Sequence, residues 1–147
     1  MKQQTHLIHI ATHGKGLYEF TREIETWLRQ IELGGEHPKT GLLTVFCQHT
    51  SASLGIQENA DPDVLTDLGA ALDRLAPADA GWVHDTEGAD DMPAHVKTMV
   101  TGVSLHIPVR DGALELGSWQ GVYLAEHRAR PHRREVVLNY VGGKRRG

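Results

Sequence analysis

The sequence predicts an α+β domain built on a mostly antiparallel sheet with two or three helices. Its helical segments interrupt the strands without alternating regularly with them, which argues against a doubly wound or barrel fold. From residue 104 onward the chain reads as consecutive strands in a meander. Residues 1–147 contain no repeat and no linker long enough to divide the chain, so we expect a single compact domain.

The first third of the chain predicts a strand, a helix and a second strand. Residues 7–11 read as the first strand, and Gly34 and Gly35 end the helix that follows. Residues 42–47 form a short apolar run that predicts a buried strand, and residues 48–58 read as a polar loop. The helix is indicated by apolar side chains that recur on one face: Phe20, Ile24, Trp27, Leu28 and Ile31.

The middle of the chain predicts two helices separated by an acidic loop. Asp61 is a favourable N-cap and Pro62 suits the first helical turn, so a helix begins there and ends before Pro77. Residues 78–91 read as an irregular acidic loop. A short helix is expected over residues 93–101.

The end of the chain predicts four strands. Asp111 and Gly112 are a two-residue signal for a type I′ hairpin, and they separate strands expected at residues 104–109 and 113–116. Two further strands are expected at residues 119–126 and 134–141.

Composition limits the classes of function. Fifteen lysines and arginines against 19 aspartates and glutamates give a net charge of −4, so we expect neither a nucleic-acid nor a membrane partner held by positive charge. No apolar run is long enough to span a bilayer, and the N-terminus lacks the apolar core of a signal peptide. The single cysteine, Cys47, excludes an internal disulfide and fits a cytoplasmic location.

Ten histidines permit acid–base chemistry or a metal site with nitrogen and oxygen ligands. His84 and His95, joined by a third ligand such as His49, would form a three-histidine zinc site with an open fourth position. Glu87 or Asp91 would serve as a general base or would orient the ligands. The alternative is an acidic loop in solvent, with Asp91 as the N-cap of the next helix.

Polar residues follow the predicted buried strand directly. His49 would face a pocket built from loops, and the hydroxyls of Thr50 and Ser51 would bind phosphate or orient the imidazole. Alternatively, the three side chains satisfy backbone groups of the loop. Glu58 and Asn59 lie just before a helix N-terminus, which attracts anions, so they either point into a site or form a solvated turn.

Four residues outside these groups are candidates for substrate contacts or, in the case of Lys97, for catalysis. Trp119 and Gln120 lie between two glycines, a pattern that predicts a bulge at the rim of a pocket or, alternatively, a core tryptophan beside a turn. Arg128 lies in a basic segment that serves either an anionic substrate or solubility. Lys97 would stabilise negative charge from another face of the helix that carries His95.

Three ordered blocks of residues carry a resemblance that covers nearly the whole chain. They are HTSASL at residues 49–54 with the following Glu58-Asn59 and Asp61-Pro62, HDTEGADDMPAHVK at residues 84–97, and residues 104–128 with LGSWQGVYLAEHR at their end. These blocks resemble the YjbQ family of small cytoplasmic proteins, often described as secondary thiamine-phosphate synthases. The resemblance implies an α+β subunit, a homotrimer and a histidine-rich pocket that can bind metal. It also implies coupling of hydroxymethylpyrimidine pyrophosphate to thiazole phosphate, with release of pyrophosphate.

The leading hypothesis is therefore a thiamine-phosphate synthase-like enzyme that acts on a small phosphorylated metabolite. Imidazole ligands favour a zinc-like divalent metal over magnesium, so the alternative is a metal-dependent hydrolase of a small phosphorylated or acyl metabolite. A non-catalytic metal- or metabolite-binding protein is the rival from another class. The candidate catalytic residues are His49, Glu58, Asn59, Glu87 and Lys97. The candidate substrate-binding residues are Thr50, Ser51, Trp119, Gln120 and Arg128, and the candidate metal ligands are His49, His84 and His95.

Overall fold

The computed structural model describes residues 1–31 and 40–143, which form two antiparallel sheets and three helices. The larger sheet consists of β1 (Lys2–Thr12), β3 (Thr40–Cys47), β5 (Ser104–Arg110), β6 (Ala113–Leu114) and β8 (His132–Gly143). Across this sheet the strands follow the order β1-β8-β3-β5-β6. Strand β8 therefore lies between the N-terminal strand and β3, and it pairs antiparallel with both.

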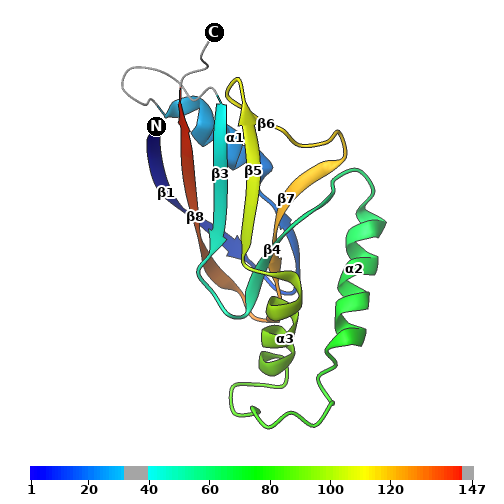
Figure 1. Cartoon of the computed structure of the whole chain (residues 1–147). Helices are drawn as coiled ribbons and strands as arrows, with labels where there is room; N and C mark the ends of the chain where they lie inside the picture. The colour runs from blue at the N-terminus through cyan, green and yellow to red at the C-terminus, as the bar shows by residue number, and fades with distance from the viewer. Residues whose placement is uncertain (32–39, 144–147) are drawn as a thin grey trace.

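The smaller sheet and the first helix together cover one face of the larger sheet (Figure 1). The smaller sheet consists of β2 (Gly16–Glu19), β4 (Ala52–Glu58) and β7 (Gln120–Glu126), in the order β2-β7-β4. Helix α1 (Thr21–Gln30) follows β2 almost directly. The backbone N–H of Phe20 donates to the carbonyl of Val122, which ties the start of this helix to β7.

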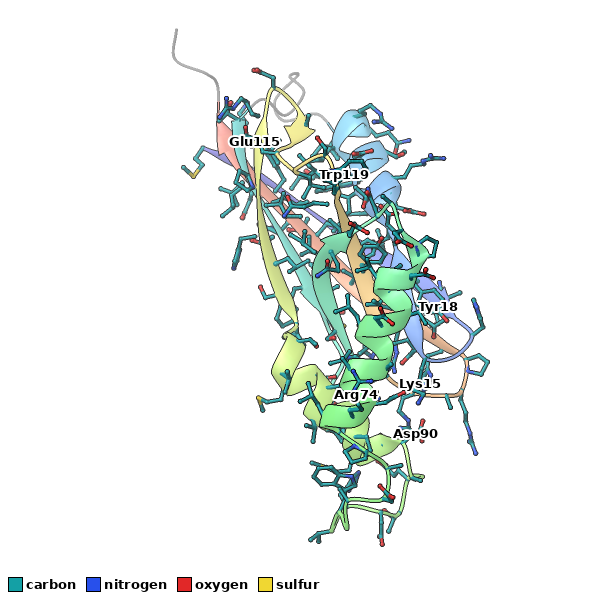
Figure 2. The ribbon with its side chains drawn as sticks, turned by 90° about the vertical axis from the view of Figure 1, so that its right-hand side faces the viewer. Lys15, Tyr18, Arg74, Asp90, Glu115 and Trp119 are labelled. Atoms are coloured by element: carbon teal, nitrogen blue, oxygen red, sulfur yellow. The ribbon has the colours of Figure 1, made fainter. Side chains whose placement is uncertain are left out.

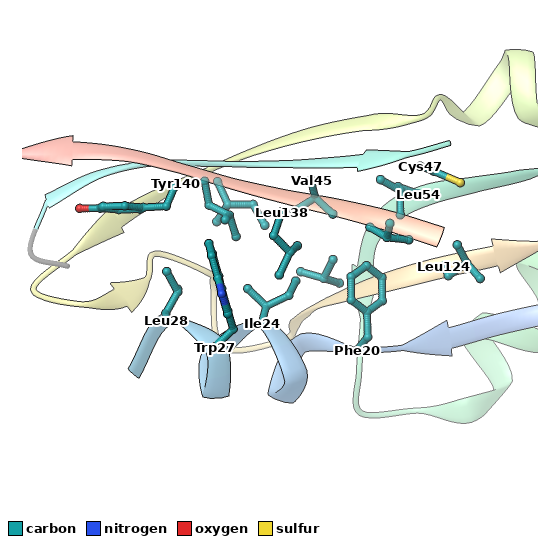
Figure 3. Packing of buried hydrophobic residues seen from close by; sticks show 14 of the residues in the cluster. Phe20, Ile24, Trp27, Leu28, Val45, Cys47, Leu54, Leu124, Leu138 and Tyr140 are labelled. Carbon is teal, nitrogen blue, oxygen red and sulfur yellow. The ribbon is translucent and has the colours of Figure 1, made fainter. Parts of the chain in front are cut away.

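The hydrophobic core lies between these two layers (Figure 3). Helix α1 contributes Ile24, Trp27 and Leu28, which recur at helical spacing and are at most 8% exposed. They face Val45 and Leu138 of the larger sheet, both fully buried. Each fully buried aliphatic side chain stabilises the fold by about 1.5–3 kcal/mol, so this one helical face fixes the position of α1.

Two further helices lie at one end of the molecule. Helix α2 (Pro62–Leu75) begins at Asp61, whose side chain accepts a hydrogen bond of 2.9 Å from the backbone N–H of Asp63. None of its residues is buried, and it runs alongside the smaller sheet, where it contacts β2. Helix α3 (Asp91–Thr101) contacts β4 and ends at Gly102, whose φ of 95° suits glycine. Within the described residues, no helix has the length and apolar character needed to cross a membrane.

The α+β prediction, with mostly antiparallel sheets and three helices, is confirmed. The hairpin signal is confirmed too, because Asp111 and Gly112 have φ values of 49° and 80° and connect β5 to β6. The predicted end of the first helix at Gly34 and Gly35 lies outside the described residues. Helix α3 begins at Asp91 rather than at residue 93.

Two expectations about the strands are wrong, and one short strand was not expected. The polar loop predicted at residues 48–58 is a strand from residue 52, because Ala52–Glu58 pairs along its whole length with β7. Polar Ser53 and Gln57 and the intervening Gly55 hid this strand, since tertiary pairing outweighs weak local β preference. The short β2 was not expected. The last four strands are not one meander either, because β7 belongs to the smaller sheet and β8 to the larger.

The close packing around β8 gives a test of this topology. A Cβ added to Gly142 would lie 2.6 Å from the carbonyl oxygen of Thr40 and would also meet the hydroxyl of Tyr140. Because the neighbouring backbone cannot move aside freely, Gly142→Ala should lower the free energy of unfolding by about 1–3 kcal/mol, measured by urea denaturation. The control is Gly143→Ala, where a Cβ meets no atom within 4 Å. Equal stability of the two variants would contradict the strand pairing described here.

Candidate functional site

Three potential metal ligands converge at the start of helix α3. One ligand atom from each of His84, Asp91 and His95 lies within 4.8 Å of the others. The Oδ2 atom of Asp91 is 2.6 Å from Nε2 of His84 and 3.2 Å from Nε2 of His95. Asp91 and His95 are four residues apart and therefore share one face of the helix, while His84 reaches them from the preceding loop. We call these three residues the HDH cluster.

Hydrogen bonding orients His95 as a ligand. Its Nδ1 atom lies 2.9 Å from the backbone carbonyl oxygen of Thr50. A carbonyl oxygen only accepts, so Nδ1 carries the proton and donates it. In the neutral ring Nε2 then presents a lone pair toward Asp91, which is the form in which it can bind a metal. Imidazoles held through Nδ1–H to a carbonyl are typical of metal sites.

Acidic groups surround His84. Its Nε2 atom lies 3.3 Å from Oε2 of Glu87, a carboxylate whose side chain is 65% exposed. The hydrogen bond with Asp91 is the main cause that raises the pKa of His84. Glu87 thus contacts the HDH cluster from its solvent side, within reach of a molecule bound there.

Arg128 holds the acidic side of the cluster in place. Its Nη1 donates to Oδ1 of Asp91, its Nε donates to Asp90 over 3.2 Å, and its Nη2 donates to the carbonyl of Glu87 over 2.8 Å. Burial works to raise the pKa of Asp91, but the hydrogen bonds with His84 and Glu87 and the charge of Arg128 together lower it. Asp91 is thus held as a carboxylate, the form that binds a cation.

A buried ion pair supports both Arg128 and the loop after β3. Glu126, with no exposed side-chain surface, accepts hydrogen bonds from Nε of Arg134 at 2.7 Å, from Oγ1 of Thr12 at 2.6 Å and from the backbone N–H of Arg128 at 3.2 Å. Nη2 of Arg134 also donates to the carbonyl oxygen of Ser51 at 3.2 Å. The pair therefore links the two sheets to the segments that carry Arg128 and Thr50.

His49 lies near the HDH cluster but is not one of its members. Its Nε2 accepts a hydrogen bond of 2.8 Å from the backbone N–H of Glu135 on β8, which fixes the ring against the larger sheet. Burial lowers the pKa of His49, and the charge of Arg134 adds to this effect. His49, Thr50 and His95 together line a mostly apolar cavity of about 770 Å³. Its other walls come from the ends of β3 and α3 and include Phe46, Thr98, Met99 and Val103.

Other candidate residues lie elsewhere. Ser51 binds Arg134 through its hydroxyl and its carbonyl, and the three donor nitrogens of Arg128 are all taken by the segment around the cluster. Lys97 is buried and pairs with Asp73 of α2 over 2.6 Å, on a different side of α3 from His95. Within a single chain, Lys97 therefore lies outside the HDH cluster.

A second group of candidates gathers at the opposite end of the smaller sheet. Glu58 pairs in register with Gln120, and the backbone N–H of Asn59 donates to the carbonyl of Trp119 over 3.0 Å. Trp119 is 67% exposed, and Figure 2 places it at the far end of the molecule from Asp90. Strand β4 separates the two groups, a length of about 20 Å at the usual rise per residue.

Sequence reasoning missed four residues that shape the site. Glu126 and Arg134 form the buried ion pair, and Ser53 and His127 form a buried hydrogen bond of 2.8 Å. Asp91 is predicted from the sequence as a base, a supporting group or an N-cap, and not as a ligand. Its spacing of four residues from His95 is the signal that identifies it as a ligand.

The fold and the HDH cluster define a small α+β protein with a histidine–carboxylate site beside an apolar cavity. A family model described as UPF0047 protein YjbQ-like matches residues 6–143, and the chain belongs to this family. It is 51% identical to a UPF0047 protein of Synechocystis, covering 96% of this chain and 93% of that protein. It is 43% identical to the UPF0047 protein YjbQ of Salmonella typhimurium, covering 92% of this chain and 95% of that one.

Solved structures show the same fold. A hypothetical protein from Aeropyrum pernix superposes with a TM-score of 0.85 at 28% identity, covering 95% of this chain and 99% of the other. A conserved hypothetical protein from Thermus thermophilus superposes with a TM-score of 0.80 at 35% identity, covering 92% of this chain and 99% of the other. The resemblance to the YjbQ family predicted from the sequence is thereby confirmed.

The buried ion pair predicts that replacing Glu126 lowers the free energy of unfolding far more than replacing Glu115, which lies in an exposed pair. Glu126→Gln leaves the charge of Arg134 buried without its partner, so the free energy of unfolding should fall by about 3 kcal/mol. The control is Glu115→Gln, which removes a pair with Arg110 at 2.9 Å that lies mostly in solvent. That change should cost less than about 1 kcal/mol. Chemical denaturation measures the free energy of unfolding of both variants. Similar losses would contradict a special contribution of the Glu126 pair to stability.

Proposed function

We propose that the protein is a metal-dependent hydrolase whose zinc-like cation is held by His84, Asp91 and His95. The observation that carries this proposal is the convergence of the two Nε2 atoms on Oδ2 of Asp91. Two imidazoles and one carboxylate are a ligand set found in catalytic zinc sites, which keep a position open for water and substrate. When bound, such a cation polarises a carbonyl and generates a nucleophile from water at neutral pH.

The residues around the cluster have separate tasks in this reaction. Glu87, whose carboxylate is 3.3 Å from Nε2 of His84 and largely exposed, is the general base that takes a proton from the attacking water. Arg128 and the Thr50 carbonyl hold the ligands Asp91 and His95 in orientation. These contacts keep the ligands in place before the substrate arrives, which limits reorganisation during the reaction.

The neighbouring cavity favours an acyl substrate. It shares His95 with the HDH cluster, and Phe46, Met99 and Val103 give it mainly apolar walls. The carboxylate of Glu87 beside the cluster opposes a phosphate dianion, since like charges repel. A small ester with a hydrocarbon acyl chain suits both features.

The synthase-like activity on a small phosphorylated metabolite is the second candidate. The carboxylates Glu87 and Asp91 favour it, because oxygen ligands suit the magnesium ion that accompanies a pyrophosphate. The two histidines in the HDH cluster weigh against magnesium.

Assembly as a homotrimer, which the family resemblance implies, is supported by the outer face of the larger sheet. Leu7, Leu42 and Phe46 lie there and are each 42–44% exposed. Covering these side chains with another copy would remove apolar surface from water. Light scattering tests this proposal: a trimer has three times the 16.2 kDa mass of the chain, and a monomer contradicts it.

Zinc binding tests the ligand set. Isothermal titration of the metal-free protein should show one high-affinity zinc site per chain, and His95→Ala should weaken it at least 100-fold because one of three ligands is lost. The control is His106→Ala, which removes an exposed histidine that contacts Thr44 on the larger sheet. Equal affinity of His95→Ala and the wild-type protein would contradict the assignment.

Ester hydrolysis tests the activity. The zinc-loaded protein should hydrolyse p-nitrophenyl butyrate, and Glu87→Gln should lower kcat by about 10²–10⁴-fold with zinc affinity nearly unchanged. Parallel assays supply hydroxymethylpyrimidine pyrophosphate with thiazole phosphate. Turnover only of those precursors would favour the synthase. A zinc-loaded protein that binds metal but turns over neither substrate would instead be a metal-binding protein.

A further inference from the structure

A second cavity, of about 480 Å³, lies between α2 and the smaller sheet. Lys97, Asp73 and His127 contribute polar groups to it, Lys15 stands at its edge, and Gly69 of α2 forms part of its wall. Figure 2 shows Lys15 beside the end of α2 that carries Arg74. The cavity is separate from the HDH cluster, because Lys97 and His95 are two residues apart and point to different faces of α3.

A chain of hydrogen bonds determines which nitrogen of His127 carries the proton. The hydroxyl of Thr101 lies 2.7 Å from the carbonyl oxygen of Lys97, which only accepts, so Thr101 donates its single proton there. The hydroxyl of Ser53, 2.6 Å from that of Thr101, must then donate to Thr101. Ser53 has no proton left for His127, 2.8 Å away, so Nε2 of His127 donates to Ser53. Its Nδ1 consequently bears a lone pair.

This lone pair faces the second cavity. His127 is 3% exposed and lines the cavity, and no hydrogen bond of the described residues involves its Nδ1. Among those residues, no fully buried side-chain nitrogen or oxygen lacks a partner, so Nδ1 must reach the cavity space. Burial, with a further contribution from the charge of Lys97, lowers the pKa of His127 to about 4. The ring is therefore neutral at physiological pH and offers one acceptor.

The charged groups leave the cavity with one surplus positive charge. The ammonium groups of Lys97 and Lys15 lie 2.6 Å and 3.4 Å from the same oxygen, Oδ1 of Asp73. Glu126 also lines the cavity, but the buried Arg134 neutralises it. Two cations that share one carboxylate suit a monoanion.

We propose that this cavity binds a small hydroxycarboxylate. The carboxylate of the ligand contacts the ammonium groups of Lys15 and Lys97, and its hydroxyl donates a hydrogen bond to Nδ1 of His127. Its hydrocarbon part lies against the leucines of the wall, Leu17, Leu65 and Leu72. A carboxylate without the hydroxyl offers no donor to Nδ1. A phosphate dianion can offer a P–O–H proton, but its double negative charge exceeds the single surplus positive charge of the cavity.

Titrations followed by ¹H–¹⁵N NMR test this proposal in the presence of a chelator, so that the outcome is independent of the HDH cluster. The probes are 2-hydroxy-4-methylpentanoate, 4-methylpentanoate and inorganic phosphate. We expect the hydroxy acid to bind at least tenfold more tightly than the other two and to shift the signals of His127 and Gly69. Equal affinities, tighter binding of phosphate, or shifts confined to other residues would overturn the proposal.

Two leucine variants on α2 localise the binding. A Cβ at Gly69 meets no atom within 4 Å, and leucine is a good helix former, so Gly69→Leu should fold and occupy the cavity. Binding of the hydroxy acid should then weaken at least tenfold. Asp67→Leu is the matched control, since this exposed residue of the same helix does not line the cavity, and it should bind like the wild-type protein. Unchanged binding by Gly69→Leu would place the ligand elsewhere.

Discussion

The buried ion pair between Glu126 and Arg134 is the constraint on which the candidate site depends. Both charges lie away from water, which costs free energy unless every remaining hydrogen-bonding position is used. Here Thr12, the backbone N–H of Arg128 and the carbonyl of Ser51 supply those partners. The pair therefore joins β7 of the smaller sheet to β8 of the larger. It also contacts the two loops that carry Thr50 and Arg128.

Those two loops are the ones that orient the HDH cluster. One carries Thr50, whose carbonyl sets the tautomer of His95, and the other carries Arg128, which holds Asp91 as a carboxylate. Helix α3 then separates two environments of opposite character. The side with Asp91 and His95 is acidic and suits a cation, whereas the side with Lys97 carries surplus positive charge and suits an anion. A single short helix thus lies between the two proposed sites.

Much of this arrangement was predictable where the signal is local. The N-cap at Asp61, the hairpin at Asp111, and the pairing of His84 with His95 all follow from residue types at short spacing. His49 was expected as the third ligand, but its ring is held by the backbone of β8, and that pairing of distant strands leaves no trace in the nearby sequence. For the same reason the sequence does not show that Arg134, six residues after Arg128 in the same basic segment, is only 4% exposed.

The central claim is that His84, Asp91 and His95 hold one divalent cation. A crystal structure of the zinc-loaded protein, with anomalous diffraction collected on both sides of the zinc absorption edge, tests it most directly. The account predicts one anomalous peak per chain, at about 2.0–2.2 Å from Nε2 of both histidines and from Oδ2 of Asp91. A peak bound by His49 or His106 instead, or no peak at this cluster in fully loaded protein, would contradict it.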